Sequence, residues 1–152
     1  MLYRATRDGF EASSFHSKCD GKANTVTIIK TNSSYIFGGY TSAAWNGHVG
    51  SITDSAAFIF SLRRNGVSYS DKFGVTQSDY AIYSLSNYGP TFGSGHDIYV
   101  VDNSNVGTGS HTNFGYSYAL PAGYTYEASN TQSFLAGSYN GWLTTEIEVF
   151  QL

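Results

Sequence analysis

The sequence predicts a mainly β domain, a two-sheet antiparallel β-sandwich flanked by a few short helices. Two observations support this fold class. Short runs of β-branched and aromatic residues alternate with frequent turn-forming residues. Helical patterns are scarce, and the 17 glycines are spread along the chain rather than gathered in a linker. Because this length is enough to bury a core, we expect residues 1–152 to form a single domain.

The best helical pattern lies near the start of the chain, over residues 9–19. Asp8 precedes it and Glu11 follows three positions later, a spacing typical of a capping box. We therefore interpret both acids as helix-start residues rather than catalytic acids. The same pattern places Cys19 on the inner side of the helix.

The strand patterns begin after this helix. Two hydrophobic runs joined by an Asn-Ser-Ser turn predict a hairpin, and Asn65-Gly66 predicts a tight primed turn after a buried strand. The final run alternates, with Ile147 and Val149 on one face and Glu146 and Glu148 on the other. The predicted strands cover residues 25–31, 35–40, 56–62, 80–83, 97–101 and 145–151.

Residues 44–55 and 102–116 predict two long loops, which on a rigid sheet scaffold commonly carry binding residues. Trp45 lies in the first of them, and Trp142 lies in a similar turn-rich segment. Exposed tryptophans on a Ser-, Asn- and Tyr-rich sandwich can stack on sugars, so a lectin-like glycan-binding module is one alternative function. The other interpretation is that both rings cover the ends of the core.

The charges are unevenly distributed. Residues 1–72 contain all eight Lys and Arg with five acids, whereas residues 73–152 contain six acids and no basic residue. A nucleic-acid binder needs a basic face that displaces counterions from phosphates, so we expect no nucleic-acid partner. The asymmetry indicates either a polarised surface that meets a charged protein partner or two halves whose charges intermingle on folding.

The single cysteine, Cys19, allows no disulfide within the chain and favours a reducing compartment. The chain shows no signal-peptide pattern and no apolar run of 18 residues, so we expect a cytoplasmic protein that is not inserted in a membrane. Secretion stays an open alternative, because a core of this size needs no disulfides. We further expect a monomer.

Motifs in the same order along nearly the whole chain resemble the TLDc domain of the oxidation-resistance proteins. The matching segments are 3–10, 15–20, 37–42 followed by Trp45, 57–62, 88–97, 134–139 and 146–150. Two departures accompany them. TLDc domains usually begin with a further helical segment before the Leu-Tyr-Arg run, where this chain starts, and the glycine triplet before His96 reads Gly-Ser-Gly.

The resemblance implies a two-sheet β-sandwich with short helices. Members of this family are associated with protection from oxidative stress, several bind and regulate the V-type proton pump, and no catalytic mechanism is established for them. The resemblance therefore implies a non-enzymatic protein-interaction domain without a cofactor. It would dock to subunits of the V-type proton ATPase at the surface of acidic organelles, or act at mitochondria.

The candidate binding residues come from the opening block, from the Gly-rich turn and from the closing strand: Arg4, Arg7, His96, Asp97, Glu146 and Glu148. Gly93 and Gly95 are expected to adopt unusual backbone angles that aim His96 in a fixed direction. The alternative is that His96 bonds to loop backbone and Asp97 caps the turn.

Cys19 is the candidate redox residue, which makes a thiol-based antioxidant enzyme a second alternative function. His16 and Lys18 lie nearby, but the chain has no second cysteine to resolve a sulfenic acid. We therefore interpret Cys19 as a structural residue. Histidines and acids are available for a metal site, but Glu146 and Glu148 are the only close pair on one element, so we predict no metal site.

Overall fold

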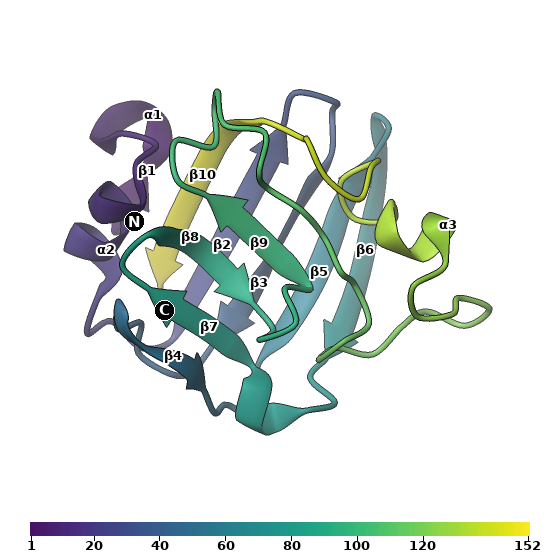
Figure 1. Ribbon diagram of the computed structural model, residues 1–152, viewed down its shortest axis with the longest axis horizontal. Coiled ribbons are helices and arrows are strands. Elements are labelled where there is room, and N and C mark those ends of the chain that lie inside the picture. The colour runs from purple at the N-terminus through teal and green to yellow at the C-terminus, as the bar shows by residue number, and fades with distance from the viewer.

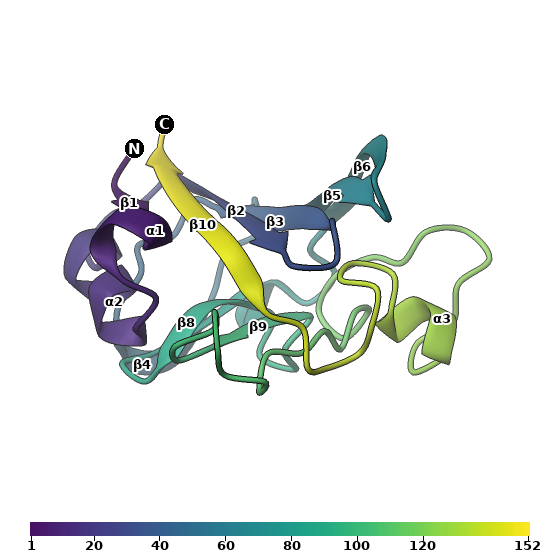
Figure 2. The same cartoon turned by 90° about the horizontal axis from the view of Figure 1, so that it is seen from above.

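The computed structural model describes residues 1–152, and its ten strands form two antiparallel sheets packed face to face (Figures 1 and 2). The larger sheet has the strand order β1 (Tyr3–Arg4), β10 (Thr144–Gln151), β2 (Thr25–Thr31), β3 (Ile36–Thr41), β5 (Phe58–Arg64) and β6 (Val67–Gly74). The smaller sheet has the order β4 (His48–Ile52), β7 (Ile82–Leu85), β8 (Tyr88–Phe92) and β9 (Ile98–Val101). The predicted fold class is confirmed.

Short helices lie at the two ends of the sandwich. Helices α1 (Ala5–Asp8) and α2 (Ala12–Cys19) cover one end, and α3 (Ser129–Gln132) lies at the other (Figure 2). A single 3-10 turn, Ser78–Tyr80, precedes β7. No helix has the length and apolar character needed to cross a bilayer.

The capping-box prediction is wrong for Asp8. This residue ends α1, and its carboxylate accepts hydrogen bonds from the backbone N–H of Arg4, at 2.9 Å, and from the Arg7 guanidinium. The helical conformation is interrupted between α1 and α2. Gly9 has a φ of +107°, which a helix does not allow, so the helix predicted over residues 9–19 begins only at Ala12.

Glu11 does lie at the N-cap position of α2, but its side chain makes no capping hydrogen bond. Asp102 supplies that bond instead: its Oδ1 accepts from the backbone N–H of Ala12 at 2.7 Å. A residue 90 positions away therefore caps the helix, which no local pattern could predict.

The alternating strands were predicted correctly. In β2, Thr27 and Ile29 face the core whereas Ile28 and Lys30 face solvent. The faces of β10 follow the predicted alternation as well. Asn65 and Gly66 join β5 to β6 with φ values of +48° and +81°, as a primed turn requires.

Four strands were missed, namely β1, β4, β6 and β8. β4 lies inside the predicted loop 44–55, and β6 is too polar to show a clean alternation. β8 contains Pro90, and a proline within a run of residues argues against predicting a strand there. The structure accommodates Pro90 where the β8–β9 register shifts between Tyr88 and Thr91.

The core between the sheets is aromatic, and Trp45 is its largest fully buried side chain. The Trp45 ring meets Phe15 of α2 and Phe92 of β8 edge-on, with centroids 5.1 and 5.7 Å apart, and its Nε1 donates to Thr25 Oγ1 at 2.9 Å. Gly39 permits this packing, because a Cβ there would lie 2.5 Å from the Phe92 ring.

Candidate functional site

The structure places five of the six candidate binding residues in two groups on different sheets, and Arg7 lies outside both. Arg4, Glu146 and Glu148 meet on the outer face of the larger sheet. His96 and Asp97 lie immediately before β9 in the smaller sheet.

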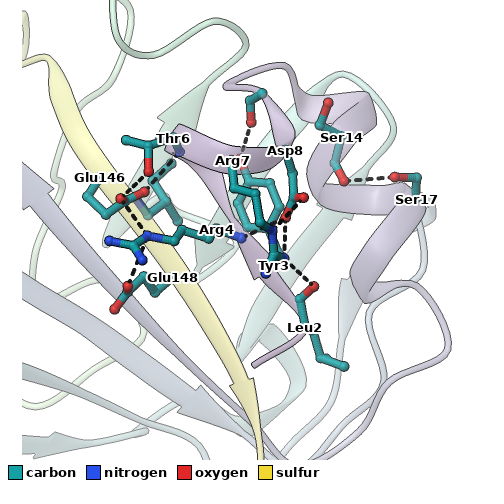
Figure 3. Close-up of polar contacts among 12 residues, drawn as sticks. Leu2, Tyr3, Arg4, Thr6, Arg7, Asp8, Ser14, Ser17, Glu146 and Glu148 are labelled. Atoms are coloured by element: carbon teal, nitrogen blue, oxygen red, sulfur yellow. Dashed lines mark hydrogen bonds and ion pairs between the residues drawn. The ribbon is translucent and has the colours of Figure 1, made fainter.

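Arg4 lies between the two glutamates of β10 (Figure 3). Its Nε is 3.1 Å from Glu146 Oε2 and 3.5 Å from Glu148 Oε1. The antiparallel register of β1 with β10 places Arg4 opposite Glu148, so segments from the two ends of the chain meet. Thr6 completes the cluster, because its N–H and hydroxyl donate to Glu146 at 3.1 and 2.5 Å.

Hydrogen bonds from Thr6 and Arg4 keep the Glu146 carboxyl ionised. Partial burial raises the pKa of this carboxyl, but the hydrogen bonds from Thr6 and Arg4 outweigh the burial and bring the pKa below its usual value. Glu146 is therefore an anion at neutral pH, held by a cation that is itself half-exposed.

A hollow of about 330 Å³ lies beside this cluster, and we call it the Arg4 hollow. It is lined by Arg4, Ile28, Lys30, Ile36, Thr145, Glu146 and Glu148. Two isoleucines thus lie among four charged side chains. Lys30 is exposed and makes no ion pair, so its ammonium group is available to a ligand.

Apolar side chains continue from the hollow across the outer face of the larger sheet. They form the apolar face: Val26, Tyr40, Phe58 and Phe150, all partly exposed. The rings of Tyr40 and Phe58 stack with centroids 5.1 Å apart. No helix or loop covers this side of the sheet (Figure 2).

Arg7 does not line the Arg4 hollow. Its guanidinium pairs with Asp8 at 2.7 Å (Figure 3), and this hydrogen bond lowers the pKa of Asp8 to about 2. The two arginines of the opening block therefore have different surroundings, although they are three residues apart.

His96 has the fixed orientation that its glycine-rich turn predicts. Gly93 and His96 have φ values of +79° and +64°, in the left-handed region. The prediction of an unusual backbone angle is wrong for Gly95, which has no positive φ and instead permits close packing, since a Cβ there would lie 2.1 Å from the Tyr116 ring. The imidazole stacks on Tyr99 with centroids 5.0 Å apart and 19° between the planes, and its Nδ1 lies 3.1 Å from His111 Nε2. Burial, followed by the neighbouring His111, lowers the pKa of His96.

Asp97, in contrast, is completely buried and anchors a loop. Its carboxylate accepts from the backbone N–H groups of Gly115, Ser117 and Tyr118 at 2.9, 2.9 and 3.3 Å. Burial raises its pKa to about 7, although these three donors act in the opposite direction. The structure thus favours the structural interpretation of Asp97, because a partner cannot reach its side chain.

Comparison with known protein families gives a match over the whole chain. The model of the TLDc domain matches residues 1–152. The chain belongs to the TLDc domain family. Comparison with curated proteins gives no match.

In this TLDc domain the side chains behind the two alternative functions are buried. Cys19 has no exposed surface, and burial raises the pKa of its thiol to about 12, whereas a peroxide-reactive cysteine needs an accessible thiolate. Trp45 and Trp142 are 1% and 2% exposed, so they cover the core, as the second interpretation of these rings predicts. No observation favours the thiol enzyme or the lectin.

Sequence reasoning missed Ile28 and Lys30 of the Arg4 hollow, and Thr6 of the cluster beside it. Ile28 and Lys30 share the solvent face of a correctly predicted strand, so the alternation of β2 could have found them. Thr6 gave no signal, because its contact with Glu146 depends on the pairing of the first and last strands of the TLDc domain.

Proposed function

We propose that this TLDc domain is a non-enzymatic protein-interaction domain that docks through the outer face of its six-stranded sheet. The observation that carries this proposal is the continuity of the charged Arg4 hollow with the uncovered apolar face. Contiguous apolar surface with a polar rim is typical of protein interfaces.

Arg4 is the central recognition residue of this proposal. Its side chain is 47% exposed, and its only hydrogen bond uses Nε, so both terminal nitrogens are free to donate. Arginine suits interfaces because its planar guanidinium can bind a carboxylate with two parallel hydrogen bonds. Together with the unpaired Lys30, it favours a partner segment that carries acidic and apolar side chains.

The partner we propose is a subunit of the V-type proton pump, and the role is protection from oxidative stress. Both follow from the family rather than from the geometry. A partner on the cytoplasmic side of the pump would place the chain in the cytoplasm, at the surface of acidic organelles, with mitochondria as the alternative. We propose that the chain acts as a monomer and binds no nucleic acid.

Binding of purified peripheral pump subunits to the immobilised chain tests this function. Lys30→Glu places a carboxylate at the Arg4 hollow, and Lys22→Glu makes the same charge change at an exposed lysine outside it. We expect Lys30→Glu to weaken binding at least about tenfold, as central interface residues do, and Lys22→Glu to change it less than about twofold. No binding by the unaltered chain, or equal losses in the two variants, would overturn the proposal.

A further inference from the structure

Two histidines face each other on the smaller sheet, and neither contributes to the docking surface. His96 Nδ1 lies 3.1 Å from His111 Nε2, and the ring centroids are 5.1 Å apart. The segments that carry them pair at an isolated bridge between Tyr99 and His111. Both imidazoles are partly exposed to solvent.

The other nitrogen of His111 fixes its tautomer. Nδ1 lies 3.1 Å from the carbonyl oxygen of Gly109, which can only accept, so Nδ1 carries the proton. Nε2 is therefore left with a lone pair directed at His96. A histidine that donates its remote N–H to a backbone carbonyl is the usual arrangement of a metal ligand.

We propose that His96 Nδ1 and His111 Nε2 together bind one divalent transition-metal ion, Cu²⁺ or Zn²⁺, with water in the remaining positions. Two nitrogens at about 2.0–2.1 Å from one ion, with about 90–110° between the bonds, lie about 2.9–3.4 Å apart. The observed 3.1 Å falls within this range. The ion takes the place of the proton that the two rings share.

Binding requires no net release of a proton. His96 moves its proton from Nδ1 to Nε2, which has no hydrogen-bond partner within the chain and faces no competing bond. Nδ1 then presents a lone pair to the ion. The exchange of tautomer breaks only the hydrogen bond between the two rings.

The fold holds both rings in place before the ion arrives. Tyr99 stacks on His96 and also contacts His111, with centroids 5.0 and 4.9 Å away. Asp97, the residue that follows His96, is held in place because its buried carboxylate accepts hydrogen bonds from backbone N–H groups. Rotamers locked in this way reduce the conformational entropy that a two-ligand site would otherwise lose.

The ligand set defines which ions bind. No group of three or more His, Cys, Asp or Glu side chains is placed to hold an ion, so the proposed site has two protein ligands. Imidazole favours Cu²⁺ over Zn²⁺, following the order of divalent first-row metals, and Mg²⁺ prefers oxygen ligands. We expect Cu²⁺ to bind more tightly than Zn²⁺ and Mg²⁺ not to bind.

Isothermal titration of the full chain with CuCl₂, ZnCl₂ and MgCl₂ tests the site. Tyrosine fluorescence gives a local readout, because bound Cu²⁺ would lie beside Tyr88 and Tyr99 and quench them. His96→Asn keeps a residue that tolerates a left-handed φ, and His111→Gln removes the second ligand. The matched control is His48→Gln, at an exposed histidine elsewhere.

We expect one equivalent of Cu²⁺ to bind and quench the tyrosines, and each of the two ligand variants to lose at least tenfold in affinity. His48→Gln should bind as the unaltered chain does. Melting curves show whether the two ligand variants are folded. If one of them is unfolded, the Cu²⁺ affinity of the other tests the proposal. The proposal is overturned if the unaltered chain binds no equivalent of Cu²⁺, or if the folded ligand variants bind it with unchanged affinity.

Discussion

The two sheets differ in how the polar groups beside them are satisfied. On the larger sheet, Arg4, Glu146 and Glu148 pair side chain to side chain at a half-exposed surface. On the smaller sheet, Asp97 and His111 pair with backbone groups. Exposed side-chain pairs add little stability and can exchange partners, whereas a buried carboxylate with three backbone donors belongs to the scaffold. The first arrangement suits recognition of a partner, and the second suits fixed positioning of a side chain.

The largest expected effect is on stability, and it comes from substituting the scaffold residue Asp97. Asp97→Asn puts an amide NH₂ against a backbone N–H, because both carboxylate oxygens of Asp97 accept such bonds. We expect the free energy of unfolding to fall by about 2–4 kcal/mol, measured by urea denaturation. The control, Asp79→Asn at an exposed position, should change it by less than about 0.5 kcal/mol. Equal effects of the two substitutions would refute a scaffold role for Asp97.

A smaller effect on stability is expected on the recognition side. Arg4→Gln removes a half-exposed ion pair and should lower the free energy of unfolding by less than about 1 kcal/mol. Its affinity for the pump subunits should nevertheless fall at least about tenfold, since the proposed docking surface places the guanidinium against the partner. Arg7→Gln is the matched control, because Arg7 pairs with Asp8 and does not line the Arg4 hollow. If Arg7→Gln weakens binding as much as Arg4→Gln, the hollow is not the recognition site.

Local patterns account for the part of the fold that the sequence predicts. The alternation in β2 and β10 and the Asn65-Gly66 turn depend on neighbours within a few residues, and all three are confirmed. The missed features depend on contacts across the chain. Asp102 caps α2 from 90 residues away, and the two-residue strand β1 exists only because β10 lies beside it. Such contacts leave no periodic signal in a single sequence.

The candidate site, like the fold, was predictable only in part. The family resemblance, rather than periodicity, selected Arg4, Glu146 and Glu148, and the structure brings these three together. Asp97 has an anionic side chain in a turn-rich segment, which suggests a surface position, yet the loop at 115–118 folds over it. The His96–His111 pair stayed hidden because fifteen residues separate two histidines that the strand pairing of β9 aligns.

The central claim is that the outer face of the larger sheet is the docking surface, and isoleucine methyl NMR tests it most directly. Ile28 and Ile36 line the Arg4 hollow, whereas Ile52 is a half-exposed isoleucine in β4 of the smaller sheet. Titration with the peripheral pump subunits should shift or broaden the δ1 methyl signals of Ile28 and Ile36 and leave that of Ile52 unchanged. Binding that perturbs Ile52 and leaves Ile28 and Ile36 unchanged would contradict the account.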